Sequence, residues 1–369
     1  MYLEKLNLLN FKNYDEAELV FSQGINIFTG PNGSGKTNIL DAIYYLAITK
    51  SAFNAQDAMS IKEGEKFFMV NGVFNKNNTA YRVACSVKQG QKKVVQVDKV
   101  PYDKISSHIG KFPVVIITPY DTDLIREGSE GRRKFIDNMI SQTDSSYLSV
   151  LLQYNHVLKQ RNSLLKLSAS KSEVPDRNLF DIYDRQLLAL GQEVYQKRTA
   201  FIAGFEPIFY DKYLDIANNK EEVSLTYSSQ RSDPYFEKKF YDSFQKDVIL
   251  QRTRMGVHRD DLIFSVNEKP VKNYGSQGQQ KSYVTALKLA QYEMIKNILN
   301  IKPILLLDDI FDKLDEFRIS KLLKMVTEGQ AGQIFITDAR IEKSRWLFDK
   351  INAEIRIFKI NNGKVEGLI

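Results

Sequence analysis

Near the N-terminus, one run of residues has the types and spacing needed to hold a triphosphate: Gly30, Pro31, Asn32, Gly33, Ser34, Gly35, Lys36 and Thr37. The run fits G-x-x-x-x-G-K-[ST], the pattern of a phosphate-binding P-loop. Its glycines let the backbone turn tightly and direct N–H groups at an anion. In such a loop the lysine reaches the β- and γ-phosphates, and the last hydroxyl coordinates Mg²⁺. We therefore expect Lys36 to act on the phosphates and Thr37 to bind the metal.

The sequence on both sides of this loop predicts the elements that must position it. Residues 24–29 are mostly apolar and predict a short strand. Over residues 38–47, apolar side chains recur every three or four positions, which predicts a helix. A strand before the glycine loop and a helix after it are the context that the motif requires, and the helix N-terminus adds a positive end.

A second candidate group lies late in the chain, where the apolar run 304–307 is followed by Asp308 and Asp309. An apolar strand that delivers a carboxylate is typical of a Walker B segment. Asp308 would hold Mg²⁺, directly or through water, and Asp309 would orient water near the γ-phosphate. Two acids at a strand end also occur in plain turns, but the P-loop in the same chain favours the catalytic interpretation.

A third polar loop contains Ser276, Gly278 and Gln279 and precedes apolar residues at helical spacing. By itself, a glycine loop before a helix indicates only a second anion-facing site. The strands that carry the three loops alternate with helices. We therefore expect an α/β fold with a mostly parallel sheet, and ligand at the carboxyl ends of its strands.

The intervening segments have a different character. Short apolar runs and polar turns in residues 66–100 predict an antiparallel β meander. Helical periodicity from 132 to about 209 predicts two long antiparallel helices. We expect an ATPase domain made of residues 1–120 and 236–369, with a mostly helical arm domain inserted at 121–235. The arm either has a function of its own or serves only packing.

Composition narrows the class of protein. The chain has 369 residues, 43% of them apolar, a formal net charge of +7 and a pI of about 9.0. A basic balance weakly favours a polyanionic partner such as nucleic acid. The single cysteine, Cys85, excludes an internal disulfide framework and fits a reducing compartment. With no signal-peptide pattern and no apolar run of about 20 residues, we expect a cytoplasmic protein without membrane contact.

In their order along the chain, these motifs resemble those of the ATP-binding-cassette ATPases. More closely, the chain is similar to the RecF family of bacterial recombination and repair proteins, which is related to the structural-maintenance-of-chromosomes (SMC) proteins. The similarity covers nearly the whole chain. Besides the P-loop and Walker B, it rests on residues 6–14, 128–129, 132–133, 258–261 and the signature loop 276–280.

The resemblance implies an SMC-like ATPase head and an ATP-dependent homodimer. The signature loop of one subunit would close over the ATP held by the other, and ATP would favour the closed state by adding contacts. Ser276, Gly278 and Gln279 would meet the nucleotide in trans, and Asp315 would lie at the same interface. From the residues alone, Lys12 in the polar turn at 10–14 either contacts a phosphate or is simply solvated.

The resemblance also implies a function and partners. It implies ATP-dependent binding of double-stranded and gapped DNA, with slow ATP hydrolysis. It further implies cooperation with RecR and RecO in loading RecA, in support of replication and the SOS response.

Some positions depart from the patterns of these families. Lys12 stands where arginine is usual, which keeps the charge but loses the bidentate fork. Asp309 replaces the glutamate of typical cassette ATPases, and its shorter reach is consistent with slow turnover. Asp338 stands where transporters have a switch histidine. The region expected to carry a Q-loop, residues 118–123, contains no glutamine.

Three alternatives compete with this interpretation. An SMC-like structural DNA tether needs hundreds of residues of coiled coil, and the insertion here is far shorter. The ATPase subunit of a transporter could have its membrane spans on another chain, but residues 258–261 and the helical insertion argue against it. A P-loop kinase would lack the loop at 276–280.

Overall fold

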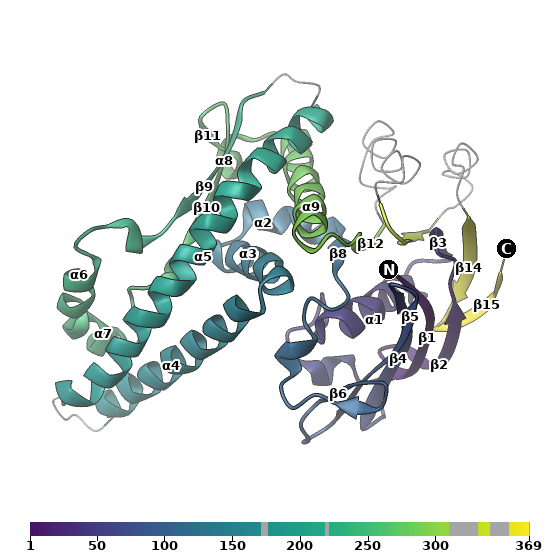
Figure 1. Cartoon of the computed structure of the whole chain (residues 1–369), viewed down its shortest axis with the longest axis horizontal. Coiled ribbons are helices and arrows are strands. Elements are labelled where there is room, and N and C mark those ends of the chain that lie inside the picture. The colour runs from purple at the N-terminus through teal and green to yellow at the C-terminus, as the bar shows by residue number, and fades with distance from the viewer. Residues whose placement is uncertain (171–175, 218–220, 310–330, 340–353, 369) are drawn as a thin grey trace. The chain divides into compact units, whose positions relative to one another are not determined.

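The computed structural model describes residues 1–170, 176–217, 221–309, 331–339 and 354–368, and the chain forms two compact units (Figure 1). The first unit contains residues 1–121 and 285–369, and the second contains residues 122–284. The sequence predicts a helical insertion that ends at 235; residues 236–284 lie in the same compact unit as its helices. No helix among the described residues has an apolar stretch long enough to cross a membrane.

An antiparallel sheet of six strands lies in the first unit, in the order β2-β1-β4-β5-β6-β7. The strands are β1 (Tyr2–Phe11), β2 (Tyr14–Val20), β4 (Phe67–Lys76), β5 (Thr79–Lys88), β6 (Val94–Val97) and β7 (Val100–Pro101). Buried and more accessible residues alternate along β4 and β5, because one face of the sheet packs on the core. The predicted meander is therefore confirmed. Cys85 is fully buried on β5, and burial raises the pKa of its thiol to about 12.

The second sheet of this unit has the order β15-β14-β3-β13-β12-β8. Its strands are β3 (Ile25–Thr29), β8 (Val114–Ile117), β12 (Ile304–Leu307), β13 (Ile334–Asp338), β14 (Ile355–Asn361) and β15 (Lys364–Leu368). All neighbours pair in parallel except β15, so the predicted mostly parallel sheet is confirmed. Every residue of β3, β8, β12 and β13 is buried, which explains their continuous apolar runs.

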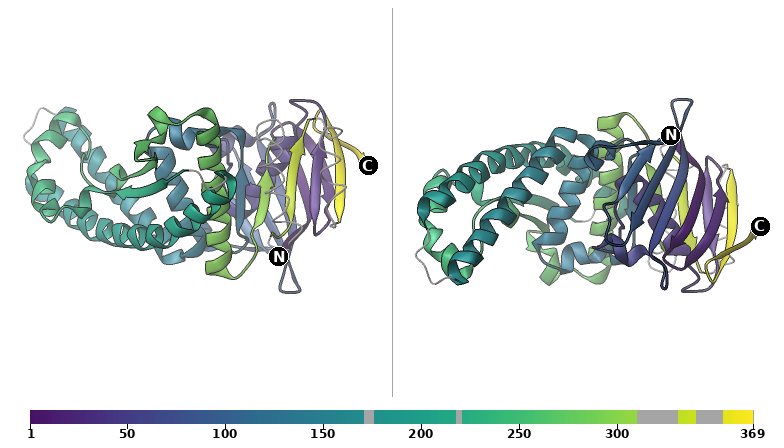
Figure 2. Two further views of the ribbon diagram at one scale, coloured as in Figure 1. Left: turned by 90° about the horizontal axis from the view of Figure 1, so that it is seen from above. Right: turned by 90° about the horizontal axis from the view of Figure 1, so that it is seen from below.

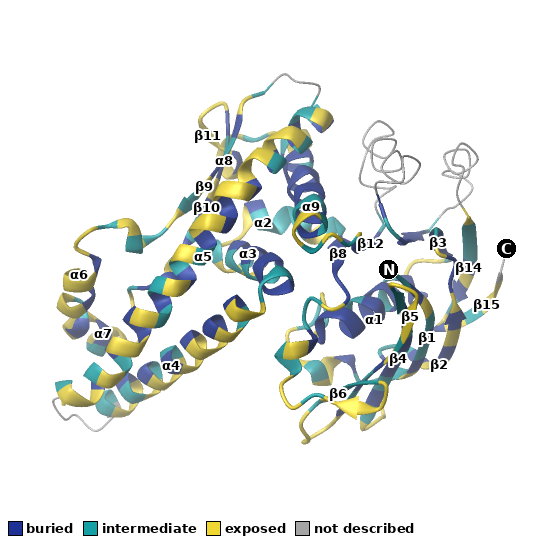
Figure 3. Ribbon diagram, in the orientation of Figure 1, coloured by how far each residue is buried: buried dark blue, intermediate teal, exposed yellow. Residues whose placement is uncertain are grey.

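Helix α1 (Lys36–Ile48) contacts strands of both sheets, namely β1, β4 and β5 of one and β8, β12 and β13 of the other. Ten of its 13 residues are buried, as expected of a helix that is apolar on several sides. Figure 3 shows α1 and much of α9 (Gln277–Leu299) as buried. Short 3₁₀ helices complete the unit: η1 (Asp57–Ser60), η2 (Ile105–His108) and η3 (Pro119–Thr122).

The second unit is mostly helical and has one small sheet, in the order β11-β10-β9. Its helices are α2 (Asp123–Arg126), α3 (Ser129–Thr143), α4 (Ser145–Ser170), α5 (Arg177–Ala217), α6 (Phe236–Asp242), α7 (Phe244–Leu250) and α8 (Val271–Tyr274). Its strands are β9 (Val223–Ser228), β10 (Asp261–Val266) and β11 (Lys269–Pro270), and its 3₁₀ helices are η4 (Gln230–Ser232) and η5 (Val257–Arg259).

Helices α4 and α5 form the predicted antiparallel pair (Figure 2). From one contact to the next, the residue number falls by seven on α4 and rises by seven on α5. The contacts join Arg161 to Asp184, Tyr154 to Gly191, and Tyr147 to Arg198. This heptad step is the one that keeps two helices in contact along a supercoil.

A buried polar network holds α3, α5 and β10 together. Arg198 on α5 donates to Asp260 over 2.9 Å and forms an ion pair of 2.9 Å with Asp137. Arg132 on α3 donates to both carboxylate oxygens of Asp261, over 2.6 and 3.0 Å. Burial raises the pKa of Asp260, and Arg198 opposes that shift. Residues 132 and 258–261, which supported the family resemblance, therefore include side chains that fix the structure of this unit.

Candidate nucleotide-binding site

The P-loop joins β3 to α1, and its glycines have backbone angles that other residues rarely adopt. The φ angles of Gly30, Gly33 and Gly35 are 150°, 79° and 113°. A Cβ at Gly30 would lie 2.0 Å from the carbonyl oxygen of Ile360, and one at Gly35 would lie 2.6 Å from Nδ2 of Asn13. Glycine is thus required at both positions by conformation and by space.

The turn between β1 and β2 anchors the P-loop from outside. Asn13 Nδ2 donates to the carbonyl oxygen of Ser34 over 3.1 Å, and the Tyr14 hydroxyl donates to that of Gly35 over 3.0 Å. Asn38 on α1 donates to Oδ1 of Asn13 over 2.7 Å. No local sequence pattern indicates that this turn supports the loop.

Lys36 lies at the start of α1 and is only 7% exposed. Its ammonium donates to the carbonyl oxygens of Gly30 and Pro31, both over 2.8 Å. Burial lowers the pKa of Lys36, and Asp309, Asp308 and Asp338 oppose that shift. The ammonium is therefore held inside the loop, where a phosphate oxygen would compete with these carbonyls for its protons.

Residues from the ends of β12 and β13 meet the start of α1 beside the P-loop, because β13 lies between β3 and β12. The hydroxyls of Thr37 and Thr337 each donate to Oδ1 of Asp308, both over 2.8 Å. Thr337 also accepts from the backbone N–H of Asp309 over 2.8 Å. Burial raises the pKa of Asp308, and the two hydroxyl hydrogen bonds oppose it. Thr37 and Asp308, both predicted from sequence as Mg²⁺ ligands, thus lie within hydrogen-bonding distance, whereas Thr337 was not predicted.

The oxygens of Thr37 and Asp308 fit the donor set of Mg²⁺, which prefers hard oxygen ligands and keeps several waters. Among the described residues, no group of three or more His, Cys, Asp or Glu side chains could hold a metal ion.

Lys12 is paired within the chain. Its ammonium lies 2.6 Å from Oδ2 of Asp41, which is fully buried on α1. Ser51 and the backbone of Ala52 also donate to the same carboxylate, over 2.7 Å each. Contact between Lys12 and a nucleotide phosphate stays a prediction.

In the second unit, the signature loop has a local structure that its sequence specifies. The backbone N–H of Ser276 donates to Gln279 Oε1 over 2.7 Å, and the N–H of Gln279 donates to Ser276 Oγ over 3.2 Å. This reciprocal pair is the capping box S-x-x-Q, and it begins α9. Gln279 Nε2 also donates to Glu221 over 2.7 Å. Gly278 is exposed, and a Cβ there would come no nearer than 3.8 Å to Ser276 Oγ.

The remaining expected positions have separate outcomes. Asp315 lies outside the described residues. Asp338 is buried at the end of β13. In the region expected to carry a Q-loop, Asp121 accepts from the backbone N–H of Thr118 over 2.6 Å and pairs with Lys288 over 2.8 Å. That carboxylate therefore anchors the segment that follows β8.

Comparison with known proteins agrees with this geometry. The model of the RecF/RecN/SMC N-terminal domain family matches residues 2–366. The DNA replication and repair protein RecF of Cytophaga hutchinsonii is 50% identical over 99% of this chain and 97% of its own. The RecF of Flavobacterium johnsoniae is 46% identical over 98% of this chain and 100% of its own.

Solved structures give the same result. A structure of the recombination mediator protein RecF with ATPrS, in the RecFOR pathway, has a TM-score of 0.88 at 28% identity and covers 99% of this chain and 97% of that one. Its counterpart with ATP has a TM-score of 0.86 at 28% identity, with 99% and 98% covered. An Smc head domain from Pyrococcus furiosus, at 17% identity and a TM-score of 0.54, shares the fold alone.

Proposed function

We propose that this chain, which belongs to the RecF family within the RecF/RecN/SMC group, is an ATP-dependent DNA-binding protein of recombinational repair. The observation that carries the proposal is the contact between Thr37 and Asp308, which joins the P-loop to the end of β12 over 2.8 Å. It brings together the two groups that a nucleotide-bound Mg²⁺ would need.

In this proposal the chain's own groups bind and orient the triphosphate. The N–H groups of the P-loop and the positive end of α1 would face the phosphates, and the Lys36 ammonium would exchange its carbonyl partners for phosphate oxygens. The oxygens of Thr37 and Asp308 would hold Mg²⁺, and the bound ion would neutralise phosphate charge. Asp309 would orient the attacking water, and its short side chain is consistent with slow hydrolysis.

The signature loop completes the site in trans in this proposal. Ser276 and Gly278 are exposed in the second unit, so they are accessible to the nucleotide of a second copy. Gln279 and Asp315 would lie at the same interface, and Lys12 would bind a phosphate beside the P-loop. Because ATP adds contacts only in the closed dimer, binding favours that state and hydrolysis reverses it.

DNA and protein partners follow from charge and from family membership. A net charge of +7 suits double-stranded and gapped DNA bound through phosphates, with an affinity that falls as salt rises. The similar RecF structures are described within the RecFOR pathway. We extend this to RecR and RecO as partners, to RecA loading in the cytoplasm, and to support of replication and the SOS response.

Two substitutions test the proposal. Lys36→Met should abolish ATP binding, ATP-dependent dimerisation and duplex binding, because the ammonium at the P-loop is lost. Ser276→Arg should leave ATP binding intact but block dimerisation, because a long side chain would occupy the exposed loop. Light scattering with ATP and linear duplex DNA measures the dimer, and titration with a labelled nucleotide measures binding.

The matched control is Lys50→Met, which removes an exposed lysine just beyond α1 and should change neither measurement. If both test variants still form dimers with ATP, the arrangement in trans is wrong. If the unmodified chain stays monomeric and ignores duplex DNA at every salt concentration, the proposed function is wrong.

A further inference from the structure

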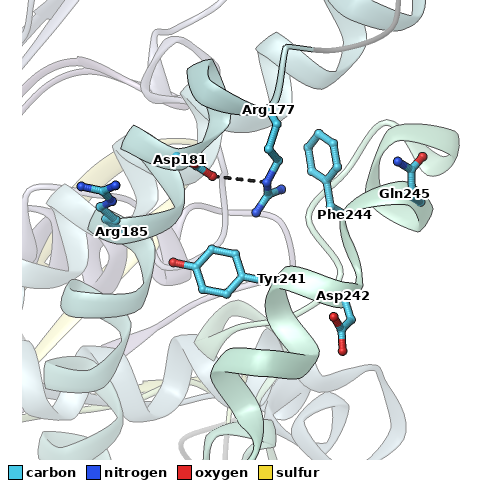
Figure 4. Close-up of a pocket in the computed structure, with 7 residues that line it drawn as sticks. All are labelled: Arg177, Asp181, Arg185, Tyr241, Asp242, Phe244 and Gln245. Carbon is cyan, nitrogen blue, oxygen red and sulfur yellow. Dashed lines mark ion pairs between the residues drawn. The ribbon is translucent and has the colours of Figure 1, made fainter.

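Ion pairs in this chain differ in what they connect. In the second unit, a pocket of about 550 Å³ lies between α5 and the segment that joins α6 to α7 (Figure 4). Its Arg177 pairs with Asp181 over 3.2 Å and with Asp184 over 3.0 Å, and all three residues belong to α5. Those pairs stabilise the helix that carries them. In the first unit, by contrast, Lys288 joins α9 to the edge of the nucleotide-binding sheet.

Lys288 lies near the middle of α9 and is only 7% exposed. Its ammonium donates to the carbonyl oxygen of Ile116 over 2.9 Å and pairs with Asp121 over 2.8 Å. Asp121 in turn accepts from the backbone N–H of Thr118 over 2.6 Å. A lysine is seldom so deeply buried unless its charge is paired. The ammonium therefore holds two successive parts of the chain, the end of β8 and the turn that follows it.

The position of β8 relates this contact to the nucleotide site. Among the described strands, β8 is the last in its sheet and pairs with β12 alone. The carbonyls of Pro113 and Ile117 accept from β12, and the donor to Ile117 is the backbone N–H of Asp308, over 2.9 Å. Along a strand, carbonyls point alternately to the two sides, so that of Ile116 points away from β12. Lys288 thus binds the end of β8 from the side opposite to Asp308.

Asp308 is anchored through both of its neighbouring strands. On one side, Thr337 of β13 donates to its carboxylate over 2.8 Å. On the other side, the backbone of Asp308 is fixed to β8, whose end rests on Lys288. An apolar residue at position 288 would leave a buried carbonyl and the carboxylate of Asp121 without this partner, which is costly. The end of β8 would then shift, and Asp308 would shift with it.

We propose that Lys288 is a positioning residue for nucleotide hydrolysis: it clamps the end of β8 to α9 and so keeps Asp308 in place beside the P-loop. The inference rests on the proposed function, in which Asp308 holds the Mg²⁺ of bound ATP. In this role Lys288 acts through the backbone of β8. Its loss lowers the rate of hydrolysis and the affinity for the metal but leaves nucleotide affinity nearly unchanged, because Asn13 and Tyr14 still support the P-loop.

The test compares Lys288→Met with the unmodified chain, both full length. At saturating ATP and Mg²⁺, phosphate release should be slower by about tenfold or more, as expected when a reacting group is slightly misplaced. The Kd for a labelled ATP analogue should stay within about twofold. Electron paramagnetic resonance should show Mn²⁺ bound about tenfold more weakly in the complex with a non-hydrolysable ATP analogue.

A second measurement uses no nucleotide. Amide hydrogen exchange at residues 114–118 and 307–309 should be about tenfold faster in Lys288→Met, because both strand ends lose one anchor. Asp121→Asn removes the charge but keeps an oxygen for the N–H of Thr118, so it should slow hydrolysis less, by about threefold. Added to Lys288→Met it should slow hydrolysis no further, because the two side chains act as one pair.

Two control variants separate position from folding. Lys296→Met makes the same change farther along α9, at a partly exposed position, and should alter none of these measurements. Val83→Ala shortens a buried side chain on β5 of the other sheet. It should lower the free energy of unfolding, while its rate of hydrolysis stays within about twofold of the unmodified chain.

Unchanged hydrolysis and Mn²⁺ affinity in Lys288→Met would overturn the proposal, as would an equal loss of both in Val83→Ala. Failure of the proposed function would look different. If the unmodified chain hydrolyses no ATP, the proposed hydrolysis is wrong, but Mn²⁺ affinity and amide exchange still decide the role of Lys288.

Discussion

The P-loop and the signature loop differ in one respect. Contacts within the chain determine the shape of the P-loop to a greater extent than that of the signature loop. At the P-loop, positive φ angles and the backbone of Ile360 demand glycine at position 30. At the signature loop, Gly278 is exposed in the first turn of α9, where the chain leaves room for a Cβ. Contacts with described residues explain why position 30 is glycine, but they do not explain why position 278 is glycine.

This difference shows where the requirement for glycine in each loop comes from. The P-loop is shaped by β3, α1 and the turn at Asn13 and Tyr14, all within one chain. The capping box of Ser276 and Gln279 sets the backbone of the signature loop, but among the described residues the nearest atom to a Cβ at Gly278 would be Ser276 Oγ at 3.8 Å, which does not require glycine. A close approach by another group would explain a glycine there, which agrees with the proposed lid over a second copy's nucleotide.

The largest contrast should come from adding one methyl group to each loop. Gly30→Ala should remove measurable ATP binding and lower the free energy of unfolding by about 2–4 kcal/mol, because the Cβ meets a backbone oxygen at 2.0 Å. Gly278→Ala should keep stability and ATP binding but weaken ATP-dependent dimerisation at least tenfold. Nucleotide titration, urea unfolding and light scattering measure the three properties. The contrast would be contradicted if Gly30→Ala and Gly278→Ala changed dimerisation equally when no nucleotide is present.

Asp308→Asn should affect hydrolysis more than folding. The amide keeps an oxygen that can accept from Thr37 and Thr337, but it loses the charge that attracts Mg²⁺. We expect the ATPase rate to fall by about 100-fold, measured as phosphate release in saturating ATP and Mg²⁺. Asp103→Asn, at an exposed position, is the control, and an unchanged rate in Asp308→Asn would show that the metal lies elsewhere.

Because of His258, lowering the pH should destabilise the second unit, which carries the signature loop. Its Nδ1 accepts from the Tyr154 hydroxyl and its Nε2 donates to the carbonyl of Thr253. Burial lowers the pKa of His258 to about 4. Between about pH 4 and the unfolded value of about 6.5, only the unfolded chain binds the proton, so stability rises with pH across that window and is complete above it.

The free energy of unfolding should therefore fall by about 2 kcal/mol from this residue alone between pH 7.5 and 5. Urea unfolding of the unmodified chain and of His258→Gln at both pH values isolates the contribution. His108, whose pKa burial also lowers, stays in both proteins and cancels. Identical pH dependence in the two proteins would show that His258 is not neutral when folded.

The smallest effect should come from Glu221→Ala, which removes the acceptor that holds the Gln279 amide. The capping box can still form, so ATP binding should not change and ATP-dependent dimerisation should weaken about threefold. Glu221→Gln keeps an acceptor oxygen at this place and should stay near the unmodified chain in light scattering. A larger loss for the glutamine variant than for the alanine variant would contradict a positioning role.

Prediction from sequence succeeded where local structure depends on residues close together in the chain. The glycines and lysine of residues 30–37 lie on one turn, and the strand before Asp308 is read from its own apolar run. The capping-box pattern S-x-x-Q of residues 276–279 is likewise present in the sequence itself. In such cases the geometry is local, so spacing alone defines it.

The sequence by itself determined a P-loop, a Walker B strand, a signature loop and an α/β class with a helical insertion. Tertiary structure alone decided that Thr337 donates to Asp308, that Asn13 and Tyr14 support the P-loop, and that residues 236–284 join the helical unit. The reason is that strand order is a property of the whole sheet. The position of β13 between β3 and β12 brings Thr37 and Thr337 to one carboxylate, and no local pattern records that order.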